Sequence, residues 1–375
     1  MKSCPPFRHY QTYLSYKAHK SYKAYKTNKA NRPTSNNKKG KMENPYIKQF
    51  PRLMAGKKIL YVHGFGSSGQ SGTVSKIREM LPGATVVAPD LPIHPEEAMA
   101  LLRETCGSAQ PDLIIGTSMG GMYTEMLRGY DRILVNPALR MADTMHEHGM
   151  MGKQVFSNPR QDGMQEFIVT KALVKEYRAM TDCCFNGVDD EERGRVWGLF
   201  GDEDTTVNNY VLFSEHYPQA VSFHGGHRLI DKSLIHAVMP VVQWIDDRQE
   251  GRERPTVYIS IDSLRDSRGG QMSSAVKAFN FLFENYSVYI VAPAPSANPE
   301  YITKIQQWTQ EFINVPAYNH VIYTNRNDLL YGDYLIDPVT KNGTDAFMGT
   351  VIRFGDDTFK TWEEIIEFFD RLGGQ

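Results

Sequence analysis

Short apolar runs, each ending in a glycine, proline or polar residue, recur from residue 57 onward and alternate with stretches of helical periodicity. The spacing of apolar residues in the intervening SKIREML, PEEAMALLRETC and GGMYTEMLRGY is typical of amphipathic helices. Continuous apolar strands that alternate with helices indicate a parallel sheet covered on both faces. We therefore predict an α/β fold. Its strand candidates are KKILYVHGF, ATVVAPDLP, DLIIGTS, RILVNPAL, RVWGLFGDED and AVSFHGGH.

The same alternation begins a second time after a helical stretch, LIHAVMPVVQWIDDR, and the charged segment QEGRER. The new strand candidates are PTVYISID, YSVYIVAPAP, HVIYTN, DYLID and GTVIRFG. A repeated strand–helix series behind a charged linker predicts a second α/β domain. We expect residues 51–250 to form the first domain and residues 251–375 to form a second, smaller one.

Two segments depart from this pattern. Residues 139–195 are rich in Met, Gln, Asp and Arg, and we interpret them as a lid-like insertion in which MQEFIVTKALVKEYRAM is helical. Residues 1–50 are a basic tail with a degenerate Tyr-Lys repeat and almost no aliphatic side chains before residue 42. Such a tail cannot bury enough apolar surface to offset the entropy of ordering, so we predict disorder. Met42 is an alternative start of translation.

The composition of the chain bears on its binding partners and on the cellular compartment in which it occurs. The formal net charge of −1 over 375 residues provides no overall attraction to nucleic acid or to a membrane surface. No apolar run approaches the roughly 18 residues of a membrane helix. The four cysteines do not suggest a disulfide framework, and no CxxC spacing is present. We therefore predict a cytoplasmic protein with reduced thiols and no bound metal or cofactor.

The first candidate for chemistry is Ser118, within Gly116-Thr117-Ser118-Met119-Gly120. This pentapeptide fits G-x-S-x-G and lies between an apolar strand and a helical stretch, which is the context of a nucleophile elbow. A strand can also end in glycines without any chemistry. The elbow context favours a nucleophilic serine, because the turn would lift its hydroxyl out of the sheet.

A serine nucleophile needs a base and a carboxylate that orients the base. His227 follows the last strand of the first series after a Gly-Gly turn, whereas the competing His224 lies three residues earlier, at the strand end. In the loop LFGDEDTTV we favour Asp204 as the acid and keep Asp202 as the alternative. Ser, Asp and His then occur in the chain order of α/β-hydrolases. The backbone N–H groups of Phe65 and Met119 are the candidates for an oxyanion hole.

Residues 58–250 resemble the YqiA-like esterases of the α/β-hydrolase fold. The resemblance is carried by ILYVHGFGSSGQSGTVSKIREML, VVAPDLP, LIIGTSMGG, ILVNPAL and GGHR. It implies hydrolysis of small acyl esters without a cofactor. Asp90 and His94 lie near the expected mouth of the site, and we interpret them as loop residues rather than catalytic groups.

Residues 256–369 resemble the 5'(3')-deoxyribonucleotidases of the haloacid-dehalogenase-like fold, through GDYLIDPVTKNG, VIRFGDDTFKTWEEII and YSVYIVAPAPSANP. The resemblance implies a phosphatase site with an attacking aspartate, a second aspartate, a Thr, a Lys and a Mg²⁺-binding Asp pair. At the matching positions this chain has Ser260, Asp262, Pro293, Asn327 and Asp337, the last followed by Pro338. Because the nucleophile and the phosphate-binding groups are missing, the resemblance implies a catalytically dead domain. A phosphate or nucleotide ligand for it is left open.

We therefore expect a serine hydrolase for carboxylic esters joined to a degenerate nucleotidase-like domain. The alternative is a non-catalytic binding protein in which both domains recognise ligands. Reaction with a fluorophosphonate distinguishes the two. The acyl and alcohol specificity and the oligomeric state are not indicated by the sequence.

Overall fold

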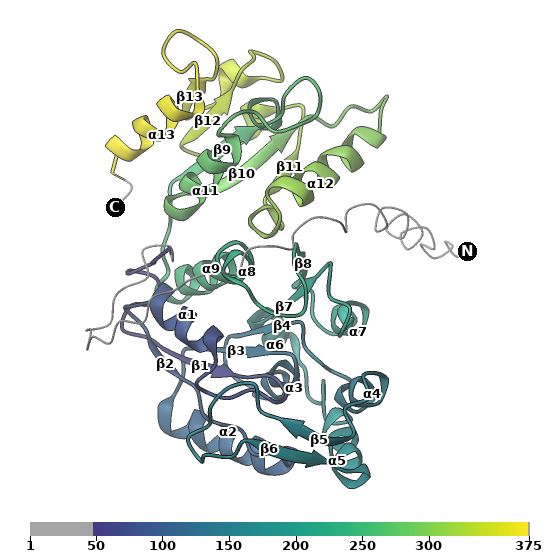
Figure 1. The fold of residues 1–375 in the computed structure, drawn as a ribbon. Helices are drawn as coiled ribbons and strands as arrows, with labels where there is room; N and C mark the ends of the chain where they lie inside the picture. The colour runs from purple at the N-terminus through teal and green to yellow at the C-terminus, as the bar shows by residue number, and fades with distance from the viewer. Residues whose placement is uncertain (1–47, 374–375) are drawn as a thin grey trace, which may run out of the picture. The chain divides into compact units, whose positions relative to one another are not determined.

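Two parallel sheets and one antiparallel hairpin organise residues 48–373, which are the residues that the computed structural model describes (Figure 1). The predicted α/β class with two parallel sheets is confirmed. The predicted disordered tail and the alternative start at Met42 lie outside the described residues, except for residues 48–50.

The first sheet has six parallel strands, and its order shows where the chain reverses direction. From one edge to the other the strands are β2 (Thr85–Val87), β1 (Lys58–Val62), β3 (Leu113–Thr117), β4 (Arg132–Val135), β7 (Val196–Gly201) and β8 (Ala220–Phe223). Strand β2 lies on one side of β1, and the later strands β3, β4, β7 and β8 follow in turn on the other side. The carboxyl ends of β3, β7 and β8 therefore lie on one edge of the sheet, which is where ligands bind in such folds.

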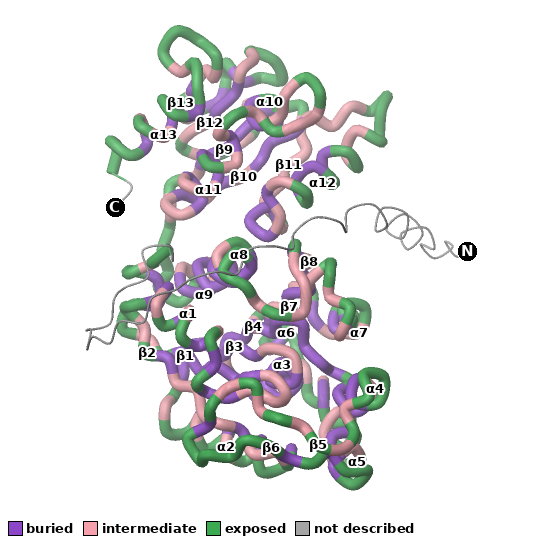
Figure 2. The backbone as a smooth tube through the Cα atoms, in the orientation of Figure 1, coloured by how far each residue is buried: buried purple, intermediate pink, exposed green. Residues whose placement is uncertain are grey.

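Both faces of this sheet are buried because successive strand residues are apolar. In β1, Leu60 and Val62 enter one hydrophobic cluster while Ile59 and Tyr61 enter the other. Figure 2 shows β3 and β4 as buried along almost their whole length. The first cluster contains residues of α2 (Pro95–Ala109), α3 (Met119–Glu125), α4 (Met141–Glu147) and α5 (Lys171–Thr181), and the second contains residues of α1 (Gly72–Met80) and α9 (Met239–Glu250).

Short elements complete this part of the chain. They are α6 (Asp190–Arg195), α7 (Tyr210–Ser214), α8 (Asp231–Ser233) and the π-helix η2 (Leu234–Val238), which runs into α9. Helix α3 ends at Glu125, five residues before the end of the helical stretch predicted from the sequence. A turn replaces the last residues of the predicted helix, and Gly129 in this turn has a left-handed backbone with φ +83°.

The segment predicted as a lid contains a hairpin as well as helices. Strands β5 (Gly152–Val155) and β6 (Glu166–Val169) pair in antiparallel register, and α4, α5 and α6 flank them. The prediction of one helix through residues 164–180 is wrong in its first part. Residues 166–169 alternate between exposed and buried positions, which suits a strand with one covered face, and Thr170 then caps α5 by accepting the N–H of Leu173.

The second sheet has five parallel strands with β9 at its centre. From edge to edge they are β11 (Val321–Tyr323), β10 (Ser287–Ala292), β9 (Thr256–Ser260), β12 (Tyr334–Asp337) and β13 (Thr350–Arg353). Side chains of β9 enter a large cluster on one face, and Tyr258 enters a smaller cluster on the other. The large cluster is formed with α10 (Ile261–Leu264), α11 (Ala275–Asn285), α12 (Glu300–Phe312) and α13 (Trp362–Arg371). The 3₁₀ turns η3 (Val315–Ala317), η4 (Asn327–Leu329) and η5 (Thr344–Ala346) complete the elements.

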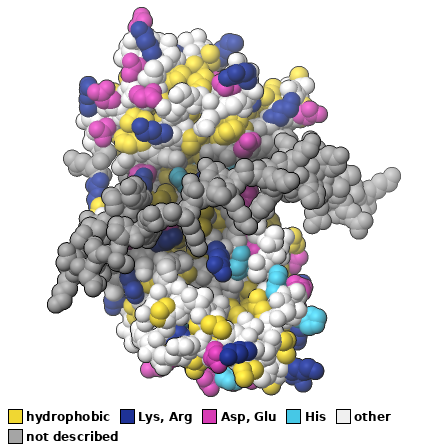
Figure 3. Space-filling view, in the orientation of Figure 1, with side chains coloured by type: hydrophobic (Ala, Val, Ile, Leu, Met, Phe, Trp, Pro, Cys, Tyr) yellow, Lys and Arg dark blue, Asp and Glu magenta, His cyan; other side chains and the backbone are white. Residues whose placement is uncertain are grey.

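Charged side chains of both signs are interspersed over the face of the molecule shown in Figure 3. Single charges of either sign lie beside one another there instead of forming a broad field of one sign. Among residues 48–373, no helix is long and apolar enough to cross a membrane.

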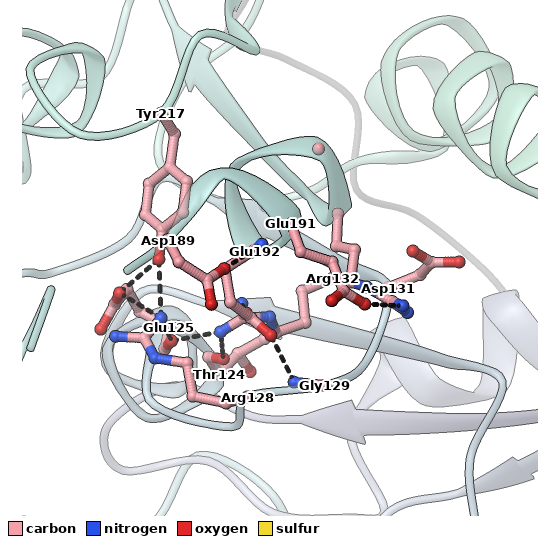
Figure 4. Close-up of polar contacts among 12 residues, drawn as sticks. Thr124, Glu125, Arg128, Gly129, Asp131, Arg132, Asp189, Glu191, Glu192 and Tyr217 are labelled. Carbon is pink, nitrogen blue, oxygen red and sulfur yellow. Dashed lines mark hydrogen bonds and ion pairs between the residues drawn. The ribbon is translucent and has the colours of Figure 1, made fainter. Parts of the chain in front are cut away.

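A buried network of charged groups connects α3 and β4 to α6 (Figure 4). The guanidinium of Arg132 is fully buried and donates to the carboxylate of Glu192 and to the carbonyl of Glu125. The Glu125 carboxylate accepts from Arg128 at 2.9 Å and from the hydroxyl of Tyr217 at 2.6 Å. Burial lowers the pKa of Arg132, because desolvation outweighs the attraction of Tyr217 and Glu192. Removal of one partner would leave a buried charge without its counterion.

We expect Arg132→Met to lower the free energy of unfolding by about 3–5 kcal/mol, the range for a buried ion pair that loses one member. The matched control is Arg195→Met, which removes the exposed pair between Arg195 and Glu191. That pair spans one helical turn and is worth about 0.3–0.5 kcal/mol. Urea denaturation followed by fluorescence measures both changes. Equal, small effects of the two substitutions would contradict a stabilising role for the network.

Candidate active site

The turn after β3 holds Ser118 in a conformation that few residues adopt. Its φ of 55° and ψ of −121° lie outside the regions favoured by L-residues, and strain of this kind is concentrated at functional sites. The N–H of Ser118 donates to the carbonyl of Val135 at 3.0 Å, so the turn is held against β4. The chain then enters α3 directly, at Met119.

Two glycines make this strand–turn–helix geometry attainable. A Cβ on Gly116 would lie 2.2 Å from Oγ1 of Thr124, and a Cβ on Gly120 would lie 2.1 Å from the carbonyl oxygen of Val62. Both distances are far below van der Waals contact. The glycines of the G-x-S-x-G pattern therefore allow α3 to pack closely against β1 and β3 directly behind Ser118.

The structure brings Ser118, His227 and Asp204 into one hydrogen-bonded chain. Oγ of Ser118 lies 3.1 Å from Nε2 of His227, and Nδ1 of the same ring lies 2.8 Å from Oδ2 of Asp204. The carboxylate accepts the Nδ1 proton, which leaves Nε2 as the acceptor for the hydroxyl proton of Ser118. His227 is about one quarter exposed, and the side chain of Asp204 is almost fully buried, at 24% and 1%.

The environment of Asp204 favours its ionised form. Burial alone would raise the pKa of this carboxyl group, but hydrogen bonds from His227 and from the backbone N–H groups of Val207 and Thr206 outweigh it, and the pKa is lowered. Oδ1 accepts the N–H of Thr206 at 2.7 Å and that of Val207 at 3.0 Å. Asp204 therefore stays an anion at neutral pH and faces the imidazole with its second oxygen.

The alternative residues of the same loops form a separate pair. Oδ2 of Asp202 lies 2.6 Å from Nδ1 of His224, and its Oδ1 accepts the N–H of Gly225 at 3.1 Å. Both side chains are about 40% exposed, with 42% for His224 and 39% for Asp202. The structure thus pairs Asp202 with His224 and Asp204 with His227, and only the second pair reaches Ser118.

The loop after β1 lies beside the turn of Ser118. A Cβ on Gly64 would lie 3.2 Å from Cβ and 3.8 Å from Oγ of Ser118. Among residues 48–373, the backbone N–H groups of Phe65 and Met119 have no hydrogen-bond partner. They belong to the two segments that flank the Ser118 hydroxyl, as an oxyanion hole requires.

Side chains from the segment 139–195 hold the Phe65 loop in place. The ring of Phe65 packs edge-on against Phe167 of β6 and Tyr177 of α5, with centroids 5.2 and 6.4 Å away. The backbone N–H and the hydroxyl of Ser157 both donate to the carbonyl of Gly66, at 2.8 and 2.9 Å. Residues 139–195 therefore support the loop that carries one of the two oxyanion-hole candidates.

Asp90 and His94 have structural partners, in keeping with their interpretation as loop residues. The Asp90 carboxylate accepts the N–H of Gly69 at 2.7 Å and that of Gln161 at 2.6 Å, so it connects the loop after β1 to the segment 139–195. Nδ1 of His94 lies 2.7 Å from Oε2 of Glu176 on α5. Neither side chain takes part in the chain from Ser118 to Asp204.

His63 is a residue of this site that the sequence analysis missed. Its ring is buried and accepts the N–H of Leu91 at Nε2, while Nδ1 donates to the carbonyl of Gly64 at 2.9 Å. Burial lowers its pKa, so the ring is neutral and serves as both donor and acceptor. The signal was its position: a histidine at the end of an apolar strand, directly before a glycine of the predicted oxyanion loop.

Residues at the positions of the phosphatase motifs lie at the carboxyl edge of the second sheet. Ser260 ends β9 and Asp337 ends β12, and both are buried, whereas Asp262 is exposed in α10. Asp337 accepts from the hydroxyl of Thr344 at 2.6 Å, and that hydroxyl oxygen accepts from Nδ2 of Asn327 at 3.0 Å. Burial is the main reason that the pKa of Asp337 is raised. Pro293 directly follows β10 and is partly exposed.

Groups of three or more His, Cys, Asp and Glu side chains that could hold a metal ion are absent from residues 48–373. Cys106, Cys183 and Cys184 are free thiols in this part of the chain. Burial raises the pKa of the Cys106 thiol to about 11, which keeps it protonated at neutral pH.

Comparison with known proteins identifies relatives of two parts of the chain. The sequence model of the uncharacterised protein family UPF0227 matches residues 58–233. A putative 5'(3')-deoxyribonucleotidase of Vibrio phage KVP40 is 32% identical over 127 residues, which is 33% of this chain and 70% of the phage protein.

Solved structures of α/β-hydrolases are similar to about half of the chain. Est1E from Butyrivibrio proteoclasticus has a TM-score of 0.36 and 16% identity, and the match covers 53% of this chain and 89% of that protein. For an esterase of a marine microorganism the TM-score is 0.33 and the identity 17%, with coverage of 54% and 99%. For tomato methylketone synthase I complexed with 2-tridecanone the TM-score is 0.33 and the identity 12%, and the match covers 52% of this chain and 98% of that protein.

The family match and the curated relative agree with the two resemblances found in the motifs. The match at residues 58–233 spans β1 to α8 of the first sheet, including the turn of Ser118 and the loop of His227. The likeness to the phage protein agrees with the nucleotidase-like motifs of residues 256–369. Residues 58–233 are therefore similar to UPF0227, the family of YqiA-type esterases, and the chain belongs to the family of the phage deoxyribonucleotidase.

Proposed function

We propose that this protein is a serine hydrolase that cleaves carboxylic esters of small molecules with Ser118 as nucleophile. The observation that carries the proposal is the hydrogen-bonded chain from Ser118 through His227 to Asp204, with distances of 3.1 and 2.8 Å. Its base is oriented by a buried anion, and its nucleophile stands in a strained turn at the carboxyl edge of the sheet. This combination supports acyl transfer.

In the first half of the reaction, Oγ of Ser118 attacks the ester carbonyl carbon while Nε2 of His227 takes the hydroxyl proton. The negative charge on the former carbonyl oxygen is stabilised by the N–H groups of Phe65 and Met119. The intermediate collapses to an acyl-serine, and the imidazolium gives its proton to the departing alcohol. Asp204 keeps the Nδ1 proton in place and stabilises the imidazolium.

In the second half, water attacks the acyl-serine with His227 again as the base. The carboxylic acid leaves, and Ser118 regains its proton from Nε2. All steps use groups of this chain and water, so the proposal requires neither a metal nor a cofactor. The free thiols of the described residues are in keeping with the predicted cytoplasmic location, which we retain as part of the proposal.

The direct test is hydrolysis of p-nitrophenyl acetate and p-nitrophenyl butyrate by the purified full chain. We expect turnover of both esters with no added cofactor, and the same rate after treatment with a chelator, since no step uses a metal. Absence of any ester hydrolysis, together with no reaction with a fluorophosphonate, would instead favour a non-catalytic binding protein.

We further propose that the second sheet has lost phosphoryl transfer. Ser260 lacks the carboxylate that would attack phosphorus and bind Mg²⁺, and Asn327 lacks the positive charge of a lysine. Instead, the side chain of Asn327 donates to Thr344, which in turn donates to Asp337. These two hydrogen bonds join the three side chains, and Oδ1 of Asn327 is buried without a partner among residues 48–373.

Magnesium-dependent release of phosphate from deoxyribonucleoside monophosphates should therefore be undetectable with the purified full chain. The measurement is a phosphate-release assay with the wild type and Asp262→Asn, a substitution at the one aspartate of the expected D-x-D pair that remains. Turnover that is abolished in Asp262→Asn would overturn the proposal. Turnover that is equal in both proteins would identify a contaminating phosphatase.

A further inference from the structure

The end of β4 contacts the backbone of the nucleophile turn on both sides of a single residue, Asn136. The carbonyl of Val135 accepts the N–H of Ser118 at 3.0 Å, and the N–H of Ala138 donates to the carbonyl of Ser118 at 2.9 Å. The backbone N–H and carbonyl of Ser118 are therefore hydrogen-bonded to Val135 and Ala138, the two residues that flank Asn136 and Pro137. The side chain of Asn136 contacts the two other loops of the site.

The carboxamide of Asn136 bridges the loop of Asp204 and the loop of His227. Its Oδ1 accepts the N–H of Gly201, at the start of the acid loop, at 2.7 Å. Its Nδ2 donates to the carbonyl of Gly226 at 3.0 Å and to that of His227 itself at 3.2 Å. Since an N–H can only donate and a carbonyl can only accept, these partners require this orientation of the amide.

The burial and backbone of Asn136 indicate a site built for this residue type. Asn136 is 2% exposed, so the three polar contacts of its side chain are shielded from water. Its φ of 45° lies in the left-handed region, which asparagine tolerates better than most residues other than glycine. Its backbone N–H donates to the carbonyl of Leu199 in β7 at 2.8 Å, so main chain and side chain both engage the strand and loop that carry the acid.

We propose that Asn136 is a positioning residue of the hydrolase site, an inference that rests on the proposed function of Ser118, His227 and Asp204. It fixes the spacing between the acid loop and the histidine loop, while its neighbours hold the nucleophile turn. The hydrogen bonds of its carboxamide go to the backbone of Gly201, Gly226 and His227 and to no side chain of those three residues, so it acts through the backbone of their loops. A misplacement of catalytic groups by about 1 Å can lower the rate by roughly 10²-fold.

Two substitutions separate the amide bridge from the backbone conformation. Asn136→Gly accommodates the positive φ without strain but removes the carboxamide. Asn136→Asp keeps an acceptor for Gly201 and replaces the donor with an oxygen that faces two carbonyls. The matched control is Asn319→Gly, which replaces an exposed asparagine with a similar φ of 56° on the second sheet's domain.

With p-nitrophenyl butyrate as substrate, we expect both Asn136 variants to lower kcat by about 10- to 100-fold, with KM within about twofold of the wild type. The rate of labelling by a fluorophosphonate should fall in parallel, and Asn319→Gly should leave both rates unchanged. A merely structural role would lower the melting temperature without this selective loss of kcat in the folded protein.

The outcomes distinguish this inference from the proposed function. If Ser118→Ala is inactive while Asn136→Gly keeps wild-type kcat, the positioning role is refuted and the proposed nucleophile stands. If Ser118→Ala keeps the wild-type rate, both proposals are overturned. If Asn136→Gly fails to fold, Asn136→Asp decides, and unchanged kcat in that variant refutes the positioning role.

Discussion

Replacement of Ser118 by alanine is expected to lower kcat for p-nitrophenyl butyrate by about 10⁴- to 10⁶-fold, because loss of a serine nucleophile removes covalent catalysis as a whole. Alanine keeps the Cβ, so the strained backbone at φ 55° stays as it is in the wild type. Only the oxygen that lies 3.1 Å from Nε2 of His227 is removed. The loss should therefore appear in catalysis and not in folding, which circular dichroism verifies.

The matched control for this substitution is Ser108→Ala. Ser108 is an exposed serine of α2 whose hydroxyl donates only to the carbonyl of Thr105, at 3.2 Å. We expect its replacement to leave kcat unchanged. A Ser118→Ala protein that retains half of the wild-type rate would show that another group attacks the ester.

The second large loss of kcat is expected on substitution of the proposed triad acid, Asp204. Asp204→Asn should lower kcat by about 10⁴-fold, the size of the effect when the orienting carboxylate of a serine triad becomes an amide. An amide can donate to Nδ1, which favours the ring tautomer whose Nε2 carries the proton and cannot accept one from Ser118. Because the Asp204 side chain is almost fully buried, at 1% exposure, little water is available to stabilise the imidazolium in place of the lost carboxylate.

Asp202→Asn makes the same chemical change two residues away and is the matched control. Its carboxylate pairs with His224, is 39% exposed and does not reach His227. We expect a loss of less than about threefold, since solvent-exposed ion pairs contribute little. If Asp202→Asn lost more activity than Asp204→Asn, the acid would have to be reassigned to Asp202. Steady-state kinetics of the two variants with one ester are sufficient.

The architecture of the first sheet was largely predictable from the sequence because its strands are buried on both faces. A strand such as Leu113–Thr117 then has a continuous apolar sequence, which differs clearly from the periodicity of a helix. The turn at Ser118 was predictable for a related reason. Gly116 and Gly120 are required by close backbone contacts, so the need for glycine is visible in the sequence.

The hairpin in residues 139–195 was not predictable in the same way. Glu166–Val169 is a strand of four residues followed at once by Thr170 and α5, and the two elements together contain the apolar positions of one long helix. Pairing with β5, which no local pattern shows, determines that these residues are extended. Tertiary contacts override local periodicity here.

The role of Asn136 could not be predicted from the sequence, for a different reason. The asparagine occurs in RILVNPAL, where it reads as the end of a strand before a proline. Its partners, Gly201, Gly226 and His227, are 65 to 91 residues away along the chain. Only the order of strands in the sheet, with β4 between β3 and β7, brings the three loops within reach of one side chain.

The most direct test of the central claim is to locate the covalent adduct of a fluorophosphonate probe on the full chain by mass spectrometry. Trypsin releases Ser118 in the peptide of residues 104–128, whose two serines are Ser108 and Ser118, and fragmentation distinguishes them. We predict one phosphonylated residue per chain, at Ser118, and no labelling in His227→Ala, which lacks the base. A protein that hydrolyses p-nitrophenyl butyrate but carries the adduct at another residue would contradict the account.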